Sequence, residues 1–441
     1  MARIELPPPT PDEFGFDVLR LIRRPDVSTF IQRANQAYWY WSELKRQVMP
    51  AGATPAQVWH VVRNSRLLVR RPLHLAQGEA FAFEYAVTDS ILERLHLFDL
   101  NLGGSRQGDG IIAPSERRGL LLSSSMEEAI TSSQLEGAAT TREVAKTMLR
   151  QGRKPRNQSE RMIYNNYQAM QLLLTLRNEP LTPDGLLRLH AVITQGTLDD
   201  PAKEGRLRLN DDVRVVDYTT SEVVYHPPTF TELPALLTAY CRLANEETPA
   251  GFIHPVVRAS ILHFLLGYLH PFADGNGRTA RAVFYWYLLR KGYWLVEYLS
   301  ISRLILKSAA QYARAYLHTE YDGNDLTYFI NYQVRVLYQA LESLKAHISR
   351  KVAEKRELLD LKRLTTFNDR QLELVREVVT DADAQFTVRE VQERFGVVTQ
   401  SARTDLQGLE AAGLLNSHRR GKKVIFFRAP DFEAVLARLR R

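Results

Sequence analysis

The sequence predicts a mainly α-helical protein that carries one small β-hairpin. Apolar residues recur at helical spacing in residues 256–269, and a second apolar helical run follows in residues 282–289. Between residues 126 and 336, short β-branched runs bounded by turn residues occur only at 212–228. Near the C-terminus, three helix patterns are combined with two short strand patterns. We therefore expect a helical core with a hairpin flap, an N-terminal helical extension and a separate C-terminal domain.

Length and composition limit the remaining choices. A chain of 441 residues should hold about two to four domains. Cys241 is the only cysteine, which excludes an intramolecular disulfide framework and a multi-cysteine zinc site. No apolar run reaches the length of a membrane span, and the N-terminus lacks the pattern of a secretory signal. These features predict a cytoplasmic protein without membrane contact, and the net charge of +8 is a mild basic bias.

The run HPFADGNGRTAR at residues 270–281 combines residue types that phosphate chemistry uses. His270 can take a proton from a hydroxyl near neutral pH, and Asp274 suits a hard cation such as Mg²⁺. The Gly-Asn-Gly segment can direct backbone N–H groups to an anion where a helix begins. Arg278 and Arg281 then follow at i and i+3 on that helix. The run predicts a nucleotide phosphate site with a proton acceptor beside it.

The same run matches the signature HPFx(D/E)GNGRxxR of the Fic family without a departure, and the chain therefore resembles Fic proteins. The resemblance implies transfer of AMP from ATP to a Ser, Thr or Tyr hydroxyl of a target protein, or of the enzyme itself, with release of pyrophosphate. It implies that His270 is the general base and that Asp274 binds Mg²⁺ or Mn²⁺. It assigns the anion hole around the α-phosphate to Gly275, Asn276 and Gly277, and the β- and γ-phosphates to Arg278 and Arg281.

A second motif lies upstream, where residues 132–137 fit the pattern (S/T)xxxE(G/N) of the inhibitory helix in Fic proteins. Ser132 opens the pattern, and Glu136 is expected to pair with Arg281 and so to occupy the guanidinium meant for the γ-phosphate. Misalignment by about 1 Å can cost about a hundredfold in rate. A serine-capped helix end would produce the same pattern, and the same glutamate could instead position water for the reverse reaction.

Residues 212–217 and 222–226 form the predicted hairpin, which Pro227 and Pro228 end because they cannot donate ladder hydrogen bonds. In Fic proteins such a flap covers the nucleotide and binds the target as an added strand. The candidate contacts are Val223, Val224 and Tyr225. A plain connecting hairpin is the alternative.

Two further nucleotide contacts are expected near the adenine, Tyr312 and Asn324. The family has a G-D-x-T-like turn where this chain has Gly-Asn-Asp-Leu-Thr at residues 323–327, so the alignment is offset. A core tyrosine and a helix cap are the alternatives. His254 and His263 are expected to be hydrogen-bonded structural histidines without a catalytic role.

The C-terminal segment predicts a winged helix-turn-helix domain. Asn368 and Thr387 each have capping-box spacing, and Thr399 can cap a third helix that ends before Gly413. Strand patterns at 414–415 and 424–427 flank a basic loop, and the run from 398 to 415 resembles bacterial regulators. The expected DNA contacts are Thr399, Gln400, Ser401, Arg403, Thr404, Arg419, Arg420, Lys422 and Lys423. Dimerisation or protein docking is the alternative use of this fold.

The aromatic cluster at residues 38–41 is expected on a helix that ends near Pro50, as a core or interface face and not as a platform for nucleic acid. Residues 101–110 form a glycine-rich boundary. The expected divisions are an N-terminal helical extension at 1–110, a Fic domain at 111–340 with an inhibitory helix at about 123–137 and the flap at about 212–228, a helical connector at 341–366, and the winged helix domain at 367–441.

Two classes of function compete at this point. The first is an autoinhibited protein adenylyltransferase with a regulatory or targeting C-terminal domain. The second is a transcription regulator whose Fic core senses a nucleotide, and a Fic enzyme with another nucleotide donor is a further alternative. Because a pure sensor would not need both His270 and Asp274, the sequence favours the transferase. The oligomeric state, including a homodimer, stays open.

Overall fold

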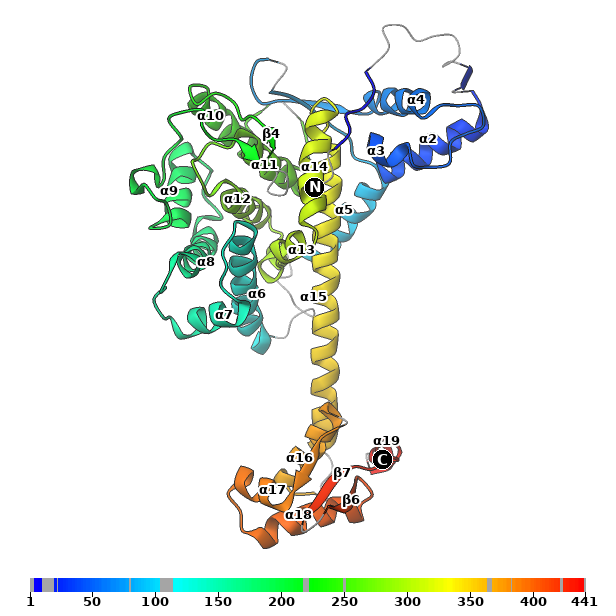
Figure 1. Cartoon of the computed structure of the whole chain (residues 1–441), viewed down its shortest axis with the longest axis vertical. Helices are drawn as coiled ribbons and strands as arrows, with labels where there is room; N and C mark the ends of the chain where they lie inside the picture. The colour runs from blue at the N-terminus through cyan, green and yellow to red at the C-terminus, as the bar shows by residue number, and fades with distance from the viewer. Residues whose placement is uncertain are drawn as a thin grey trace. The chain divides into compact units, whose positions relative to one another are not determined.

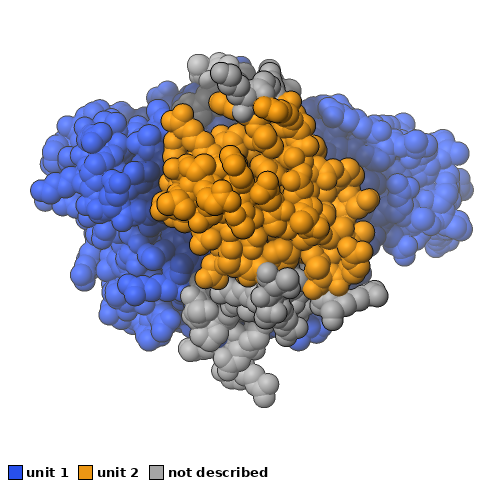
Figure 2. All heavy atoms as spheres, turned by 90° about the horizontal axis from the view of Figure 1, so that it is seen from below, with its two compact units in different colours: residues 1–344 blue, residues 345–441 orange. Residues whose placement is uncertain are grey.

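The computed structural model describes the chain at residues 4–9, 20–21, 23–78, 81–103, 114–216, 222–248, 251–362, 367–381, 383–420 and 423–439. The chain divides into two compact units, residues 1–344 and residues 345–441, which Figure 2 colours separately. Helices dominate both units, and the prediction of a mainly helical protein is confirmed (Figure 1). No helix in the described ranges is long and apolar enough to span a membrane.

The N-terminal part of the first unit is not purely helical. Its elements are α2 (Pro25–Ala37), α3 (Trp41–Leu44), α4 (Pro55–Leu67), β1 (Arg71–His74), β2 (Ala82–Tyr85) and α5 (Asp89–Leu102). Strands β1 and β2 pair antiparallel, with Leu73 opposite Phe83, and the sequence prediction of a helical extension missed them. Each strand has only four residues and β1 contains Pro72, so the strand signal is weak in the sequence.

The aromatic cluster lies at a turn and not within one helix, so that prediction was wrong. Helix α2 ends at Ala37, and Tyr38 adopts a left-handed conformation with φ of 51° while its N–H donates to the carbonyl of Ala34. The chain then starts α3 at Trp41. The turn directs Tyr38, Tyr40 and Trp41 into one core cluster with Trp59, where all four are buried. The expectation that this cluster forms a core face is confirmed.

The rest of the first unit is a helical bundle. Its elements are α6 (Pro114–Leu135), α7 (Arg142–Gln151), α8 (Gln158–Leu176), α9 (Pro183–Thr194), η2 (Pro201–Lys203), β3 (Val215–Val216), β4 (Val223–Tyr225), α10 (Leu233–Ala244), α11 (Pro255–Leu269), α12 (Asn276–Arg290), η3 (Trp294–Tyr298), α13 (Ile301–Lys307), α14 (Ala309–Tyr321) and α15 (Thr327–Lys362). Helices α11 and α12 form the centre, because nearly all their residues are buried. Helices α6, α8, α9 and α10 pack around this pair.

The predicted hairpin is present and shorter than expected. Strands β3 and β4 pair antiparallel, with Val215 opposite Tyr225. The residues expected to form its turn, 218–221, fall outside the described ranges, as do residue 217 and most of the glycine-rich boundary predicted at 101–110.

The second unit begins within α15. It contains α16 (Asp369–Thr380), β5 (Gln385–Thr387), α17 (Val388–Phe395), α18 (Thr399–Ala411), β6 (Leu415–Arg420), β7 (Lys423–Arg428) and α19 (Phe432–Leu439). The sheet order is β5-β7-β6, and β6 pairs antiparallel with β7. An apolar core that includes Leu374, Leu406 and Phe426 joins the helices to the sheet.

Several local predictions for this unit can be compared with the structure. The capping boxes at Asn368 and Thr387 are confirmed. The cap predicted at Thr399 was wrong, because Val398 is the residue before α18 and the Thr399 hydroxyl donates to Gln392 Oε1 at 2.9 Å. Strand β5 and helix α19 were not predicted. Strand β5 has only three residues, which is too short for an alternating pattern to be recognised.

Candidate active site

His270 terminates the central helix α11 and adopts a left-handed conformation with φ of 44°. Its Nδ1 lies 3.0 Å from the carbonyl oxygen of Gly267. A carbonyl can only accept a hydrogen bond, so Nδ1 carries the proton and Nε2 keeps its lone pair. Burial lowers the pKa of His270 below its usual value. The imidazole is therefore neutral near pH 7, and Nε2 can accept a proton.

The loop after His270 is closed by the side chain of Asn276. Its Nδ2 donates to the carbonyl of Phe272 at 2.9 Å, and its Oδ1 accepts from the N–H of Phe272 at 3.0 Å. Phe272 is buried and stacks on the ring of His190, with 3.7 Å between ring centroids. Because the Asn276 amide holds the loop, the predicted contribution of this residue to an anion hole has to come from its backbone N–H.

The surroundings of Gly275 and Gly277 are crowded. Gly275 has φ of 85°, and a Cβ there would lie 2.8 Å from a methyl group of Thr194. A Cβ on Gly277 would lie 2.1 Å from Oε1 of Glu136. Helix α12 starts at Asn276, so its first N–H groups have no acceptor within the helix and its positive dipole end points to this place. The geometry fits an anion at the start of α12, with the Glu136 carboxylate close to it.

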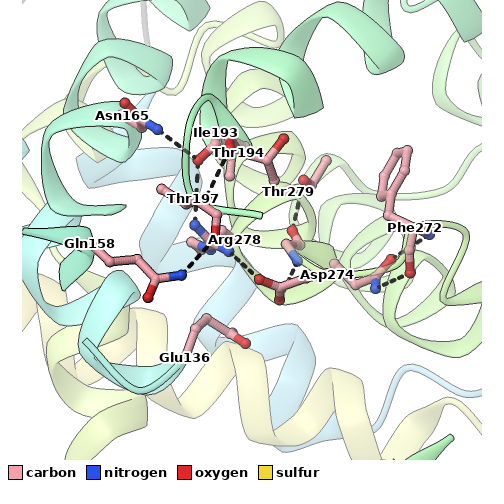
Figure 3. Close-up of polar contacts among 12 residues, drawn as sticks. Glu136, Gln158, Asn165, Ile193, Thr194, Thr197, Phe272, Asp274, Arg278 and Thr279 are labelled. Carbon is pink, nitrogen blue, oxygen red and sulfur yellow. Dashed lines mark hydrogen bonds and ion pairs between the residues drawn. The ribbon is translucent and has the colours of Figure 1, made fainter. Parts of the chain in front are cut away.

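Asp274 and Arg278 form an ion pair at the edge of this loop (Figure 3). Asp274 Oδ2 lies 3.1 Å from Arg278 Nη2, and its Oδ1 accepts from the N–H of Gly275 at 2.6 Å. The carboxylate is about half exposed, whereas the Arg278 side chain is completely buried and its Nη1 lies 3.4 Å from the carbonyl of Ile193. Burial lowers the pKa of Arg278. Asp274 is thus accessible to a cation, and the buried Arg278 guanidinium holds its carboxylate in place.

Arg281 lies one turn further along α12 and is held by the end of α6. Its Nε donates to Ser132 Oγ at 2.8 Å, and its Nη2 donates to the Ser132 carbonyl at 2.9 Å. The same Nη2 donates to Glu136 Oε1 at 2.8 Å. The two arginines predicted to share the phosphates therefore have different partners. Arg278 pairs with Asp274, and Arg281 pairs with Glu136, as the upstream motif predicts.

Sequence reasoning missed a third residue on this face of α6. Glu128 precedes Ser132 by one helical turn and is completely buried, and burial raises its pKa. Its carboxylate accepts from the Ser300 hydroxyl at 2.9 Å and from the N–H of Ser302 at 3.0 Å, and it also accepts from the Ser302 hydroxyl. Glu128 thus anchors α6 to the start of α13, so that Glu136 meets Arg281 from a fixed position. No motif surrounds Glu128 in the sequence.

Arg208, also missed, connects the flap to the loop at residues 270–281. Its Nε donates to the carbonyl of His270 at 3.0 Å, and its backbone N–H donates to the carbonyl of Pro271 at 2.9 Å. Its Nη1 donates to Asp211 Oδ1 at 2.7 Å, and Nη2 donates to the carbonyl of Pro228. One buried guanidinium therefore joins the segments before β3 and after β4 to the backbone of His270.

His190 supports the loop from the opposite side. Its Nδ1 accepts from the N–H of Gly205 at 3.1 Å, so Nε2 carries the proton and donates to the carbonyl of Asp274 at 2.8 Å. Burial lowers the pKa of His190 to about 4, which keeps the ring neutral. Because His190 lies 84 residues before Asp274, no local pattern in the sequence connects the two.

The flap and the helix behind the site hold the remaining predicted residues. Tyr225 packs on Tyr268 of α11, with 4.9 Å between ring centroids, while Val223 stays exposed and Val224 is half-buried. The Tyr312 hydroxyl lies 2.9 Å from Nε2 of His263. The nucleotide contacts of the flap residues and of Tyr312 stay predictions.

Two histidines and Asn324 have structural partners. His263 is buried between Tyr312 and Gln333, and His254 caps α11 and lies 3.2 Å from Asp99, so the expected structural roles of both are confirmed. Asn324 has φ of 59° in the turn before α15, and its amide donates to the carbonyl of Ala82 at 3.2 Å. Asn324 therefore helps to hold strand β2, and its predicted adenine contact is untested.

The fold and the site together place a neutral imidazole beside the start of a helix that can hold an anion. Residues 180–288 match the sequence model of the Fic/DOC family, so this part of the chain is similar to that family. Relatives named protein adenylyltransferase Fic include one from Nematostella vectensis, 31% identical over 120 residues, which are 27% of this chain and 26% of that protein. One from Drosophila melanogaster is 33% identical over 113 residues, which are 26% of this chain and 21% of that protein.

The matched region thus spans about a quarter of the length of these relatives. Among solved structures, Fic-1 from C. elegans superimposes with a TM-score of 0.50 at 19% identity, covering 74% of this chain and 83% of that chain. At this identity the likeness concerns the fold alone.

Proposed function

We propose that this protein is an autoinhibited protein adenylyltransferase, which transfers AMP from ATP to a Ser, Thr or Tyr hydroxyl of a target protein or of itself. The observation that carries the proposal is the combination of a neutral His270, with its Nε2 available, and the glycine-lined start of α12 on the same loop. Phosphoryl transfer depends on such positioning and charge neutralisation more than on covalent chemistry.

In the proposed reaction, His270 Nε2 accepts the proton of the target hydroxyl. The hydroxyl oxygen then attacks the α-phosphorus, the bond from the α-phosphorus to the bridging oxygen of pyrophosphate breaks, and pyrophosphate leaves with that electron pair. The first N–H groups of α12 stabilise the charge on the α-phosphate oxygens. Arg281, when released from Glu136, binds the γ-phosphate. Asn276, Arg208 and His190 keep the loop in place through the contacts described above.

The residues fit a magnesium ion that arrives with the nucleotide. Asp274 presents a half-exposed carboxylate, and the described residues contain no group of three His, Cys, Asp or Glu side chains that could form a protein cage for a metal. Mg²⁺ commonly binds one or two carboxylates together with substrate phosphates. Bound in this way, Mg²⁺ or Mn²⁺ would neutralise charge on the phosphate oxygens.

The proposed inhibition follows from the position of Glu136. Its carboxylate accepts a hydrogen bond from the Arg281 guanidinium. The same carboxylate occupies the position beside Gly277 at the start of α12. A γ-phosphate that approaches Arg281 would have to displace this carboxylate, because two anions cannot share the guanidinium without repulsion. ATP bound beside Glu136 would be misaligned for in-line attack.

Two variants test the proposal. Glu136→Gly should raise the amount of protein-bound AMP formed from α-labelled ATP, and a second change, His270→Ala, should abolish it. Glu143→Gly is a matched control, because Glu143 is exposed at the start of α7. The inhibitory assignment is wrong if Glu136→Gly stays at the wild-type level over a range of Mg²⁺ and Mn²⁺ concentrations. Mass spectrometry with ATP, UTP and CTP distinguishes AMP transfer from another donor, and no adduct with any of them would favour a nucleotide sensor.

The flap is the proposed docking edge for the target. Tyr225 fixes β4 on α11 through Tyr268, while Val223 is exposed on the same strand. An extended target segment could pair with this edge and bring its hydroxyl to His270. Val223→Asp should then reduce modification of a target protein more than it weakens ATP binding.

A second candidate function, DNA binding by the second unit, is supported by the position of Asp405. This residue lies on the helix proposed for recognition, yet it is buried and accepts from Arg370 Nε at 2.7 Å, so its charge is not presented to a partner. The exposed part of α18 includes Gln400, Arg403 and Thr404, and Arg419 and Lys423 lie on the β6–β7 strands. The predicted contacts at Lys422 and at the side chain of Arg420 fall outside the described residues.

A mobility-shift assay with genomic fragments tests this second candidate. Binding that weakens steeply between about 50 and 200 mM salt would support phosphate contacts. Arg403→Ala should remove sequence preference, whereas Lys423→Ala should weaken binding to all fragments alike. The absence of a shift at low salt would favour protein docking or dimerisation.

A further inference from the structure

A cavity lies in the first unit, apart from the loop at 270–281. Its volume is about 490 Å³, and its walls come from the turn after α2 and from α3 on one side and from α14 and α15 on the other. None of the described residues that line it belongs to the catalytic loop or the flap. Small-molecule sites commonly have volumes of about 300–1,000 Å³. The cavity is therefore large enough for a ligand of nucleotide size.

The cavity is lined by two guanidinium groups, those of Arg314 and Arg335. Arg335 Nη2 donates to the neutral Gln311 Oε1 at 3.0 Å, and Arg314 lies on the same helix as Gln311. Within the ranges that the structure describes, neither arginine forms an ion pair with an acidic side chain. Glu43 is the acidic residue of the wall, and its carboxylate accepts from the N–H of Tyr40 at 3.2 Å. The cavity consequently attracts anions.

Flat rings form much of the remaining wall. Trp39 is partly exposed, and Tyr332 lies under the Arg335 guanidinium, 5.5 Å from it. His318 is held against Tyr40 by stacking, with 3.9 Å between ring centroids and an angle of 7° between planes. Asn331 adds a carboxamide that makes no hydrogen bond within the described part of the chain. Such walls suit a planar heterocycle with polar edges.

We propose that this cavity binds a nucleoside monophosphate, with the phosphate on Arg314 and Arg335 and the base between the aromatic walls near Asn331. Two guanidiniums on one side of the cavity match the charge and the oxygen geometry of a phosphate. His318 is stacked on Tyr40, and burial lowers its pKa to about 4, which makes it a weak base. The Glu43 carboxylate of the wall accepts from the N–H of Tyr40. The site is therefore a binding site and not a second catalytic centre.

Helix α14 connects this cavity to α11, the helix that ends at His270. Residues 311, 314, 315 and 318 line the cavity, whereas Tyr312 and Tyr316 lie on the opposite face of α14. Tyr316 packs so closely on α11 that a Cβ added to Gly267 would lie 2.4 Å from its hydroxyl oxygen. An occupant of the cavity thus contacts the helix that packs against α11 one turn before His270.

Photolabelling of the full chain with 8-azidoadenosine 5′-monophosphate, followed by peptide mapping, tests the proposal. Adducts are expected in residues 37–47 or 328–335. AMP should protect these peptides, whereas adenosine or inorganic phosphate alone at the same concentration should protect them poorly. Equal protection by inorganic phosphate would overturn the role of the base, and adducts confined to the flap and to residues 270–281 would overturn the site.

Variants test the phosphate contact. Arg314→Gln combined with Arg335→Gln should raise the AMP concentration for half-maximal protection by about tenfold, which corresponds to about 1.4 kcal/mol, because the two amides keep hydrogen-bond donors and lose both charges. The corresponding double lysine variant should show a smaller change. Arg188→Gln combined with Arg242→Gln is the matched control, because both arginines are exposed on α9 and α10 and the charge change is the same. Unchanged protection in the double glutamine variant, with an unchanged melting temperature, would refute the contact.

This inference does not depend on the proposed transferase activity. Labelling at the cavity is read from its own peptides, whereas AMP transfer is read from covalent AMP on protein. Loss of transfer in His270→Ala should leave cavity labelling unchanged. Each proposal can therefore fail without the other.

Discussion

Replacing Glu136 by glutamine would separate the two ways in which this residue could inhibit the enzyme. Glutamine has nearly the same shape and keeps an oxygen that can accept from Arg281, but it carries no charge. In the structure the carboxylate oxygen lies 2.8 Å from Nη2, the arginine is almost completely buried, and the glutamate side chain is 25% exposed. If charge is what keeps Arg281 from a γ-phosphate, Glu136→Gln should be partly active.

The expected size follows from the contacts. A hydrogen bond with a charged partner contributes about 1.5–3 kcal/mol, and one between neutral groups contributes about 0.5–1.5 kcal/mol. Removal of the charge should therefore weaken the hold on Arg281 by about 1–1.5 kcal/mol, which corresponds to about a five- to tenfold higher population of released arginine. The bonds from Arg281 to Ser132 stay in place in this variant. Glu136→Gly, which removes both charge and volume, should be more active still.

The assay is the initial rate of AMP incorporation at saturating ATP for wild type, Glu136→Gln and Glu136→Gly. Thermal unfolding of each variant checks that the fold is unchanged. A rate for the glutamine variant equal to that of wild type, beside a fully active glycine variant, would show that inhibition is steric. A rate equal to that of the glycine variant would show that the volume of the side chain is irrelevant. The explanation that both the charge and the volume of Glu136 inhibit the enzyme would then be wrong.

Three further predictions concern groups that support the site and the second unit. Arg208→Lys keeps the charge but loses the guanidinium group, whose several N–H donors join the flap to His270. The kcat should therefore fall by about ten- to a hundredfold, while KM for ATP changes less. An unchanged kcat would exclude a positioning role for Arg208. In the Glu136→Gly variant the rate of AMP incorporation should rise with pH through an apparent pKa below 6.5 and then level off. The reason is that burial lowers the pKa of His270 and that only the neutral imidazole accepts a proton. A rise that continues above pH 7.5 would exclude His270 as the titrating group. Asp405→Ala should lower the free energy of unfolding of the second unit by about 2 kcal/mol in urea, because the buried carboxylate bonds to charged and polar partners. Glu393→Ala, at an exposed ion pair, is the control and should change it by less than about 0.5 kcal/mol.

The parts of the site that could be predicted are those within one continuous stretch. His270, Asp274 and the glycines lie on a single loop, so residue types and spacing were sufficient to identify them. The capping boxes at Asn368 and Thr387 were predictable for the same reason, since each involves two residues three positions apart. Local geometry determines such features, and a pattern in the sequence records local geometry directly.

The parts that could not be predicted depend on residues far apart in the chain. Arg208 meets the carbonyl of His270 across 62 residues, and His190 meets that of Asp274 across 84. Glu128 meets Ser302 across 174 residues. Each of these side chains bonds to backbone groups or hydroxyls, which many residue types could supply, so no recognisable signature marks the pair. The aromatic turn at Tyr38 was misread because a left-handed residue ended the helix where its apolar pattern continued.

The amino-acid sequence sufficed to propose a chemistry for this protein, because a candidate base, a candidate cation ligand and a glycine-rich candidate anion site follow one another on a single loop. It also sufficed to predict that Glu136 pairs with Arg281. The tertiary structure decided how that chemistry is held. Burial makes His270 a neutral base, and packing gives Arg278 and Arg281 separate partners. It also brings α3, α14 and α15 together around a cavity that Arg314 and Arg335 line. Charge and hydrogen-bonding capacity belong to residues, whereas burial and distance arise only when helices pack.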